Sequence, residues 1–344
     1  MKILIIGGGV CGTSAAEEIR KRDADACITI VSNEPHPLYS RVLLPHYIHN
    51  QIPRERVFLK SLDWYRERKI ELMFDEVTTL DCAARSVTCA TRRMFSYDKL
   101  LIAGGGIVNR LPLSSRPNTF HLQTIEDADA IRTAMEARRN KPTQAHIIGG
   151  GFISMEFVDL FQNAGFETHV HLHEDHFFRS LIDRETSAHL ASLLRDRGVA
   201  IHKNSIIRDF DGATLTASNK PYPCQLLGIG IGLDARFPWA EKAGIKVSRG
   251  IIANAYLETN QPNVYAAGDC AECEHPLFGR HRRVGNWTNA QMQGRHVAGV
   301  MYGEREQYTT VTSYATTVLG IQIAAIGDAD PHAALSVVSR ANED

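Results

Sequence analysis

The sequence lacks the features that mark several large classes of protein. Its formal net charge is −1 over 344 residues, so no basic excess points to nucleic acid or to an anionic membrane surface. No apolar run reaches the ~18 residues that a membrane-spanning helix needs. An expected strand begins at position 2, without the basic segment, long apolar stretch and cleavage site of a signal peptide. We therefore expect a cytoplasmic protein with no nucleic-acid partner and no membrane span.

Paired cysteines are also scarce. The seven cysteines are scattered along the chain, which indicates reduced thiols rather than a disulfide framework. Only Cys270 and Cys273 form a CxxC pair, and without a second pair or matching histidines we expect no zinc site. The pair is either a redox dithiol or two small buried residues in a loop, and we favour the second interpretation.

Histidine, in contrast, is abundant, with 15 residues. His169, His171 and His173 alternate along an expected strand, so they would share one of its faces. We interpret this face as a sheet edge or a ligand-facing surface in preference to a metal site, and we assign no metal ligands.

Two glycine-rich turns organise the chain. The first, Gly-Gly-Gly-Val-Cys-Gly at 7–12, follows the apolar run 2–6, and the second, Gly-Gly-Gly-Phe-Ile-Ser at 149–154, follows the apolar run 145–148. Each turn lies where a buried strand passes into a helix, so its glycines let the backbone approach a pyrophosphate beside the helix N-terminus. Two such turns imply two dinucleotides.

The first turn matches the GxGxxG pattern in full, at Gly7, Gly9 and Gly12. It has the strand before it and the helix after it that the pattern requires, so an ordinary strand-to-helix turn is the less favoured alternative. The acidic residue that holds a ribose is expected near the end of the second strand of such a unit. The first carboxylate after the expected strand 27–31 is Glu34, which is our candidate.

The length predicts two or three domains, and the apolar patterns predict an α/β protein. Strands are expected at 2–6, 27–31, 70–73, 77–80, 86–89, 100–103, 145–148, 168–172, 226–232, 251–253 and 263–267, helices at 13–21, 125–139, 184–197 and 286–301, and a linker at 112–120.

These stretches together resemble the FAD-dependent pyridine nucleotide-disulfide oxidoreductase superfamily, from residue 1 to about residue 330. The resemblance is greatest to the branch of rubredoxin and ferredoxin reductases, NADH oxidases and the flavin domain of assimilatory nitrite reductase. Besides the first glycine turn, the most specific matches are Pro37-Leu38-Tyr39-Ser40-Arg41, the strand 100–105, the stretch 264–272 with its Gly268-Asp269-Cys270, and Gly285-Asn286-Trp287 with Ala290 and Gln293-Gly294-Arg295.

The resemblance implies two Rossmann-like dinucleotide-binding domains, one inserted in the other, and an incomplete C-terminal interface segment. The FAD-binding domain would comprise residues 1–112 and 241–308, and the NAD(P)H-binding domain residues 113–240. Residues 309–344 would hold only the opening strands of the interface domain. A partner that supplies the rest, a different homodimer or a truncated version of the family would each explain this, so a homodimer and a hetero-oligomer both stay open.

By the same resemblance, Gly7, Gly9 and Gly12 hold the FAD pyrophosphate and Glu34 holds the adenosine ribose. Five further residues would lie along the FAD: Arg41, Ala103, Gly104, Asp269 and Trp287. For Asp269 the chemistry agrees, because a carboxylate at a strand end can accept the hydroxyl groups of the ribityl chain. A helix N-cap is the alternative role.

The second turn, with Gly149, Gly151 and Ser154, would bind NADH or NADPH, although Ser154 replaces the third glycine. Glu156 falls where the family places a residue near the nicotinamide, but the helix dipole alone also favours a glutamate there. His46 falls near the flavin and is a candidate proton donor. The other interpretation, a histidine that simply lies on a helix face, is the one we favour.

The nucleotide preference stays open. Leu172 and His173 stand where an NADH-specific member carries an acid, and no carboxylate follows until Glu174. The cationic groups His171, His173, His176 and Arg179 could instead meet the 2′-phosphate of NADPH. Weak binding of both nucleotides is a third alternative.

Val42 stands where thiol-using members of the family carry a redox cysteine, so a thiol relay is disfavoured. We therefore expect an FAD-dependent oxidoreductase that passes electrons from NAD(P)H through the flavin to a rubredoxin, a ferredoxin or an iron-sulfur subunit. The alternative is an FAD-bearing electron-transfer subunit of a larger complex, with a weak or lost NAD(P)H site.

Overall fold

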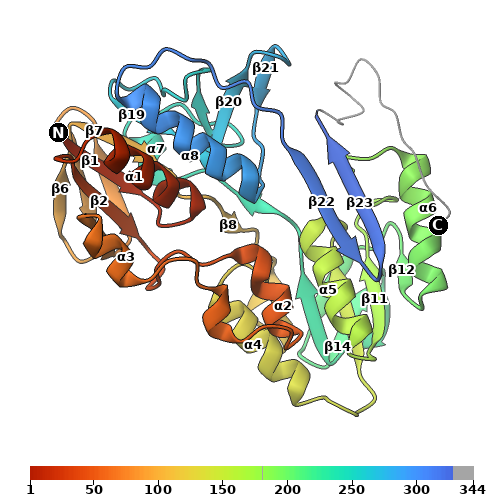
Figure 1. The fold of residues 1–344 in the computed structure, drawn as a ribbon. Coiled ribbons are helices and arrows are strands. Elements are labelled where there is room, and N and C mark those ends of the chain that lie inside the picture. Colours follow the sequence, from red (N-terminus) through yellow and green to blue (C-terminus); the bar gives the residue numbers. More distant parts are fainter. Residues whose placement is uncertain (180, 328–344) are drawn as a thin grey trace. The chain divides into compact units, whose positions relative to one another are not determined.

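The computed structural model describes residues 1–179 and 181–327, which form two compact units (Figure 1). The first unit comprises Met1–Val42, Arg54–Ile107 and Asp234–Thr312, and the second comprises Leu43–Pro53, Val108–Leu233 and the described residues from 313 onward. The main segment of the second unit is therefore inserted between two segments of the first. The boundaries lie at 107 and 234, whereas the sequence placed them at 112 and 240, and the short segment Leu43–Pro53 belongs to the second unit.

The first unit is built on a parallel sheet with the strand order β19-β7-β1-β2-β3. Its strands are β1 (Lys2–Ile6), β2 (Cys27–Ser32), β3 (Ile70–Phe74), β7 (Lys99–Ile102) and β19 (Val264–Ala266). Most of their residues are apolar and buried, as both faces of a parallel sheet require. The predicted strands in this region are confirmed to within two residues at each end.

Helices α1 (Val10–Arg22) and α8 (Trp287–Met301) lie side by side in the first unit (Figure 1). A Cβ at Gly294 of α8 would lie 2.3 Å from the carbonyl oxygen of Cys11 of α1, so a glycine is needed for this close approach. The two helices and the sheet share one hydrophobic core, which includes Ile5, Ile19 and Val297. This core holds α1, and with it the first glycine turn, against the end of β1.

Smaller elements complete the first unit. They are the antiparallel sheet of β4 (Val77–Asp81), β5 (Ser86–Cys89) and β6 (Met94–Ser96), the sheet of β18 (Ile251–Ala253), β20 (Ala271–His275) and β21 (Arg280–Arg282), helices α3 (Leu62–Glu67) and α7 (Pro238–Lys242), and the 3₁₀ helices η1 (Arg41–Leu43), η2 (Arg54–Val57) and η4 (Gly268–Cys270). The first residues of η1 belong to this unit and its last residue to the other. Strands β8 (Ile107–Val108) and β17 (Leu233–Asp234) pair where the chain passes from one unit to the other.

The second unit repeats the parallel arrangement, with the strand order β12-β11-β10-β16-β9. These strands are β9 (Thr119–Phe120), β10 (Gln144–Ile148), β11 (Glu167–His171), β12 (Ala200–His202) and β16 (Leu226–Ile229). Its helices are α2 (Leu44–Ile48), α4 (Ile125–Glu136), α5 (Phe152–Asn163) and α6 (Arg184–Asp196), and β13 (Ile207–Phe210), β14 (Thr214–Ala217) and β15 (Lys220–Pro223) form an antiparallel sheet. Each parallel sheet has a glycine turn between its central strand and the helix that follows. This arrangement confirms the predicted α/β class with two Rossmann-like folds.

The expected linker at 112–120 is wrong. The 3₁₀ helix η3 (Pro112–Ser115) and the strand β9 occupy it, and β9 adds an edge strand to the parallel sheet. The backbone N–H of Leu227 donates to the carbonyl of Asn118 at 2.9 Å, at the start of this pairing. A strand of two residues has no periodicity to detect, so its pairing with β16 had no local signal.

A β-hairpin of β22 (Ser313–Val318) and β23 (Ile321–Ile326) closes the described part of the second unit. The strand β22 lies beside α5 (Figure 1). The phenyl ring of Phe152 in α5 stacks on the ring of Tyr314, with centroids 5.5 Å apart. The remainder of the predicted segment 309–344, from residue 328 onward, lies outside the described residues.

Candidate functional site

The first glycine turn joins β1 to α1. Gly7 has a φ of +113° and donates its backbone N–H to the carbonyl of Val31 at 2.8 Å. A Cβ at Gly7 would lie 2.2 Å from the carbonyl oxygen of Ala103, and one at Gly12 would lie 2.0 Å from the carbonyl oxygen of Gly7. Among the described residues, nothing lies within 4 Å of the Cβ position at Gly9. Two positions therefore require glycine for packing, and the third leaves open space at the N-terminus of α1.

Glu34, the candidate ribose acid, lies two residues beyond β2. Its backbone N–H donates to the hydroxyl of Ser32 at 3.3 Å. Its carboxylate accepts hydrogen bonds from the Tyr39 hydroxyl and from the Arg41 guanidinium, with which it forms an ion pair. The Arg41 guanidinium lies 5.3 Å from the centroid of the Tyr39 ring. The structure thus brings Glu34 and Arg41, two of the predicted FAD residues, into one cluster.

Asp269 lies in η4, directly after β19 and therefore at the carboxyl edge of the first sheet. Burial raises the pKa of its carboxyl to about 6, and the positive charges of Arg283 and Arg41 oppose this shift. Gly268 before it has a φ of +79°, and a Cβ there would lie 3.2 Å from the Cys11 sulfur of the first glycine turn. Asp269, Arg41 and the first turn therefore belong to the same edge of one sheet.

The other predicted flavin-side residues also lie in the first unit. Ala103 donates its backbone N–H to the carbonyl of Ile6 at 2.8 Å, which places it beside the glycine turn. A Cβ at Gly104 would lie 2.9 Å from the ring of Phe237, so this backbone is closely covered. Trp287 begins α8 and is partly buried against the hydrophobic core.

The second glycine turn has nearly the same geometry as the first. Gly149 has a φ of +118° and donates its N–H to the carbonyl of His171 at 3.0 Å. The Cβ position of Gly151 has open space within 4 Å among the described residues. Ser154, which replaces the third glycine, is buried and donates its hydroxyl to the carbonyl of Gly230 at 3.1 Å. The serine in place of the third glycine therefore links the start of α5 to the residue that follows β16 (Leu226–Ile229).

The two predicted catalytic residues, His46 and Glu156, both belong to the second unit. Burial raises the pKa of Glu156, and the charge of Asp159 adds to this shift. The Thr316 hydroxyl, which donates to the carboxyl at 3.3 Å, and the charges of His46 and His49 lower the pKa. His46 lies on an exposed face of α2. The structure thus brings His46 and Glu156 close enough to interact electrostatically.

Asp159, which lies one helical turn after Glu156 in α5, was not predicted from the sequence. Its carboxylate lies 3.1 Å from Nε2 of His49 and accepts a hydrogen bond from the backbone N–H of Leu319 at 2.8 Å. These partners lie 110 and 160 residues away in the sequence, so no local pattern could have marked the residue. Asp159 links α2, α5 and the β22–β23 hairpin within the second unit.

The segment after β11 carries the residues that bear on nucleotide preference. Leu172 is buried, and a Cβ at Gly150 would lie 2.7 Å from its side chain. His173, the predicted cofactor-binding histidine, is exposed. Glu174 forms an ion pair with Arg179. The carboxylate of the next residue, Asp175, forms ion pairs with His176 and Arg184.

His171 does not take the predicted role beside a 2′-phosphate. It is fully buried in a stack of imidazole rings formed by His146, His169, His171 and His202, and the ring of Tyr222 packs against this stack. Successive ring centroids lie between 4.5 and 5.4 Å apart. The prediction of a sheet edge or a ligand-facing surface is wrong for His171, because β11 lies between β10 and β12 and this ring is buried, whereas His173 beyond the strand is exposed.

His146 and His202 were missed because the stack depends on the register of three strands. Across residues 1–179 and 181–327, no group of three or more His, Cys, Asp or Glu side chains is arranged to hold a metal ion. None of the helices in this part of the chain combines the length and the apolar character that crossing a lipid bilayer requires.

The CxxC pair is buried. The Cys270 sulfur donates to the carbonyls of Ile102 and Ala267, at 3.3 and 3.2 Å. Burial raises the pKa of the Cys270 thiol to about 12 and that of the Cys273 thiol to about 11. Both thiols therefore stay protonated at neutral pH, which fits the interpretation as small core residues.

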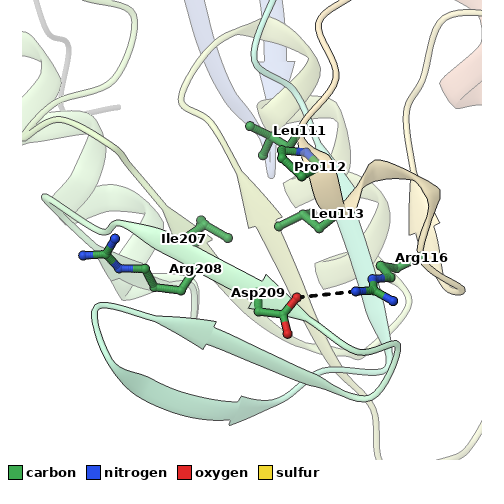
Figure 2. A pocket seen from close by; sticks show the side chains of 7 residues that line it. All are labelled: Leu111, Pro112, Leu113, Arg116, Ile207, Arg208 and Asp209. Carbon is green, nitrogen blue, oxygen red and sulfur yellow. Dashed lines mark ion pairs between the residues drawn. The ribbon is translucent and has the colours of Figure 1, made fainter.

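A cavity of about 180 Å³ lies in the second unit, away from its glycine turn in the sequence. Figure 2 shows its lining, which consists of Leu111, Pro112, Leu113, Arg116, Ile207, Arg208 and Asp209. Arg116 and Asp209 form an ion pair at 4.0 Å across it. The lining offers apolar contact and one ion pair but no nucleophile or redox-active group, so the chemistry is better sought at the glycine turns.

The residues at the glycine turns fit dinucleotides. Open space above Gly9 and Gly151 lies where the free backbone amides of a helix N-terminus bind phosphate oxygens. At the first turn, Glu34 can accept ribose hydroxyls, Asp269 can accept further hydroxyls, and Arg41 supplies a cation. At the second turn, Glu156 is the nearest carboxylate of α5. The first turn has the more complete set of groups.

Comparison with known proteins agrees with this arrangement. The family described as pyridine nucleotide-disulphide oxidoreductase matches residues 1–294. The chain is 27% identical to the assimilatory nitrate reductase electron transfer subunit of Bacillus subtilis (strain 168), over 95% of the chain and 42% of that protein. It is also 27% identical to the nitrite reductase [NAD(P)H] of the same organism, over 95% of the chain and 41% of that protein. The chain thus spans less than half the length of these two relatives.

A solved structure matches over the full length. The crystal structure of NADH:rubredoxin oxidoreductase from Clostridium acetobutylicum aligns with a TM-score of 0.82 and 25% identity. The alignment covers 100% of this chain and 86% of that one. The similarity therefore includes both glycine turns and the hairpin that follows α8.

Proposed function

The chain belongs to the pyridine nucleotide-disulphide oxidoreductase family, and on that premise we propose that it passes electrons from NADH or NADPH through FAD to a small redox protein or an iron-sulfur partner. The observation that carries this proposal is the repeated glycine turn. Gly7 and Gly149 have nearly the same positive φ, and each donates its amide to the carbonyl at the same place on the neighbouring strand. One chain with two such turns has a site for an electron-donating dinucleotide and a site for an accepting one.

When both cofactors are bound, the nicotinamide supplies a hydride and the flavin can release electrons one at a time. The chain's own residues bind and orient them. We assign Gly7, Gly9 and Gly12 to the FAD pyrophosphate, Glu34 to the adenosine ribose and Arg41 and Asp269 to the remainder of the cofactor. Ala103, Gly104 and Trp287 border it. Gly149, Gly151 and Ser154 form the second turn, for the nicotinamide nucleotide.

Glu156 and His46 are the proposed catalytic residues. Burial raises the pKa of Glu156, which favours the protonated carboxyl, and the Thr316 hydroxyl donates a hydrogen bond to it. His46 is exposed, and an imidazole is a side chain that can supply a proton. Both roles rest on the family resemblance of their positions.

The electron acceptor is proposed from the chemistry of the relatives. One relative is named as an NADH-rubredoxin oxidoreductase and another as an electron transfer subunit of assimilatory nitrate reductase. The two buried, protonated thiols of the CxxC pair do not favour an internal dithiol acceptor. Outward transfer to a rubredoxin, a ferredoxin or an iron-sulfur subunit is the simpler route. The seven free cysteines fit a cytoplasmic location.

One observation favours the second candidate function, an FAD-bearing subunit with a weak NAD(P)H site. Leu172 stands where an acid would hold the nicotinamide nucleotide, and its side chain covers Gly150. We prefer the first function because Ser154 links the start of α5 to Gly230 and Gly151 keeps its open space.

Anaerobic titration separates the two functions. The purified chain, loaded with FAD, is titrated with NADH and with NADPH while the visible flavin absorbance is followed. Bleaching by either nucleotide is the expected result. A yellow protein that neither nucleotide reduces would refute the reductase function and favour the subunit, whose flavin a partner protein reduces.

A further inference from the structure

A short segment of the chain, Leu43–Pro53, belongs to the second unit, although the residues on either side of it belong to the first. We call this segment the arm. It contains α2, and the 3₁₀ helix η1 passes into α2 without an intervening loop residue. The arm is therefore joined to the first unit, at its N-terminal end, by a continuous helical stretch that begins at Arg41.

The residues before and after the arm are fixed to each other within the first unit. The amide of Ser40 donates to the carbonyl of Val57 at 2.8 Å, and the amide of Leu59 donates to the carbonyl of Leu38 at 2.9 Å. The chain therefore leaves the first unit and returns to it at one place. A displacement of the arm acts on that place, because the two ends of the arm cannot move apart freely.

The first glycine turn is connected to the same place through the end of β2. A Cβ at Gly8 would lie 2.9 Å from the side chain of Ser32, and the hydroxyl of Ser32 accepts the backbone N–H of Glu34 at 3.3 Å. The Glu34 carboxylate forms an ion pair with Arg41, the first residue of η1. The helical stretch that carries the arm is thus bonded to the carboxyl edge of the first sheet.

Within the second unit, α2 lies beside α4 and also contacts α5 (Figure 1). The Tyr47 hydroxyl donates to the carboxylate of Asp129 in α4 at 2.6 Å, and the guanidinium of Arg132 lies 4.9 Å from the centroid of the Tyr47 ring. Nε2 of His49, the C-cap of α2, lies 3.1 Å from the carboxylate of Asp159 in α5. The arm is therefore anchored to two helices of the second unit.

One of these helices, α5, starts at the second glycine turn, because Gly151 is its N-cap. Asp159 lies about 12 Å further along the axis of the same helix. Burial would raise the pKa of Asp159, but hydrogen bonds from His49 and from the Leu319 amide hold it below the ordinary aspartate value. The anchor of the arm is thus a charged carboxylate, and any shift of α5 on nucleotide binding at its N-terminus moves this anchor.

We propose that the arm couples the two nucleotide sites, so that a nucleotide at either glycine turn strengthens the binding of a nucleotide at the other. The inference rests on the proposed function, because it takes FAD and a nicotinamide nucleotide to occupy the two turns. The connection passes from α5 through Asp159 and His49 to α2, and then from η1 through Arg41. The coupling is favourable because either nucleotide orders one end of the arm, so the second nucleotide meets an arm that is already ordered.

The rate of FAD release tests this coupling without turnover. ADP-ribose serves as the probe of the second site, because it has no nicotinamide and cannot reduce the flavin. Isothermal titration first measures its binding to the FAD-loaded protein, whose first site is already filled. The protein is then diluted with and without saturating ADP-ribose, and the rise in flavin fluorescence is followed. We expect ADP-ribose to slow FAD release about fivefold or more.

Two variants break the anchors of the arm. Tyr47→Phe removes the hydroxyl that bonds to Asp129, and His49→Ala removes the contact with Asp159. In each variant ADP-ribose should still bind to the FAD-loaded protein, but it should slow FAD release by less than about twofold.

Tyr302→Phe is the matched control. It removes a comparable bond from a tyrosine hydroxyl to a carboxylate, that of Asp23 at 2.8 Å, within the first unit and outside the arm. This variant should keep the full slowing by ADP-ribose. If Tyr47 had a purely structural role, Tyr47→Phe would lower the thermal stability and also keep the full slowing.

Hydrogen exchange shows whether the arm itself responds. Exchange in residues 44–50 should slow when ADP-ribose binds to the FAD-loaded protein, and it should slow less in His49→Ala. Unchanged exchange there, together with slower FAD release, would mean that the coupling takes another route and would refute the role of the arm.

The proposal is overturned if ADP-ribose does not bind to the FAD-loaded protein, if it binds without slowing FAD release, or if both anchor variants keep the full slowing. Flavin bleaching separates this result from the proposed function. Bleaching by NADH or NADPH without any effect of ADP-ribose on FAD release would keep the reductase and refute the coupling. Slower FAD release that depends on Tyr47 and His49, without bleaching by either nucleotide, would support the coupling and refute the reductase.

Discussion

Nδ1 of His146 and Nε2 of His171 lie 2.9 Å apart inside the second sheet. Nε2 of His146 lies 3.0 Å from the carbonyl of Pro223, so it must donate its proton there. Nδ1 of His146 is then the acceptor for Nε2 of His171. Nδ1 of His171 accepts in turn from the hydroxyl of Ser205 at 2.9 Å. The bond between the two rings requires a neutral His146, because a protonated His146 has no acceptor for the Nε2–H of His171.

The pH dependence of stability follows from these two rings. Burial, reinforced by neighbouring imidazoles, lowers the pKa of His146 to about 3 and that of His171 to about 2. The unfolded chain therefore binds more protons below pH ~6.5, the ordinary imidazole value. Stability is fully present above that pH and falls as the pH drops toward the folded-state values. His169, His202 and Lys220 face the same cluster, and burial with the charges of His169 and Lys220 lowers the pKa of His202.

Urea unfolding between pH 7.5 and 5 measures this effect. We expect the free energy of unfolding to fall by up to about 1.4 kcal/mol per pH unit for each buried histidine. His171→Gln removes one titrating ring and should give a shallower slope. His189→Asn, at an exposed position of α6, should keep the slope of the unaltered protein. Equal stability at pH 7.5 and pH 5 would contradict the neutral stack.

Alanine substitutions at Gly9 and Gly151 should distinguish the FAD site from the nicotinamide nucleotide site. Neither Gly9 nor Gly151 has a described neighbour within 4 Å of its Cβ position, and neither has a positive φ, so alanine fits the fold at both. The added methyl group would occupy the space through which a pyrophosphate approaches the helix. Gly9→Ala should lower flavin retention about tenfold or more. Gly151→Ala should retain flavin and weaken reduction by the nicotinamide nucleotide.

Flavin absorbance after gel filtration and the anaerobic titration provide the two measurements, and each variant serves as the control for the other. Unfolding of either variant, seen by circular dichroism, would show that these positions need glycine for packing. Loss of flavin from Gly151→Ala, or full retention by Gly9→Ala, would contradict the assignment of the two turns.

Replacement of Asp269 by asparagine should raise the stability of the flavin-free protein and weaken its binding of FAD. Its folded-state pKa of about 6 lies above the ordinary aspartate value of 3.8, because burial disfavours the charged form. The folded chain therefore holds its proton more tightly than the unfolded chain, and stability declines as the pH rises from about 4 through 6. Asp269→Asn removes this cost, so the flavin-free variant should have a higher Tm at pH 7.5 and should bind FAD more weakly.

Differential scanning fluorimetry and flavin content together test this prediction. Asp234 is the matched control, because hydrogen bonds from Arg236 lower its pKa to about 2. Asp234→Asn should leave the Tm unchanged or slightly lower it, without loss of flavin. An Asp269→Asn variant with a lower Tm and normal flavin content would indicate a structural cap instead of a cofactor ligand.

Much of the fold could be predicted because its main signals are local. The run Ile3 to Ile6 is apolar because a central parallel strand is buried on both faces, and the glycine at position 7 marks its end. The same pattern at 145–149 predicts the second sheet. The pair Glu34 and Arg41 lies within a single short segment, so the resemblance found both residues.

The remainder depends on contacts between distant segments. The face of β11 that carries His169 and His171 is covered because β10, β12 and β15 bring His146, His202 and Tyr222 to it, which alternation along one strand does not reveal.

The buried CxxC pair allows a direct test against a dithiol mechanism. The thiols of Cys270 and Cys273 have pKa values of about 12 and 11, because burial disfavours their thiolates, so well under 0.1% of either is thiolate at neutral pH. Cys27 is exposed on β2 and should react first with a thiol reagent.

The number of thiols that react in the folded protein should be the same before and after flavin reduction. Cys27→Ser should abolish the fast phase, and Cys273→Ser should leave reduction by the nicotinamide nucleotide intact. Two additional thiols on flavin reduction would instead mean that Cys270 and Cys273 accept the electrons as a disulfide, and a rearrangement that exposes η4 and β20 would then be required.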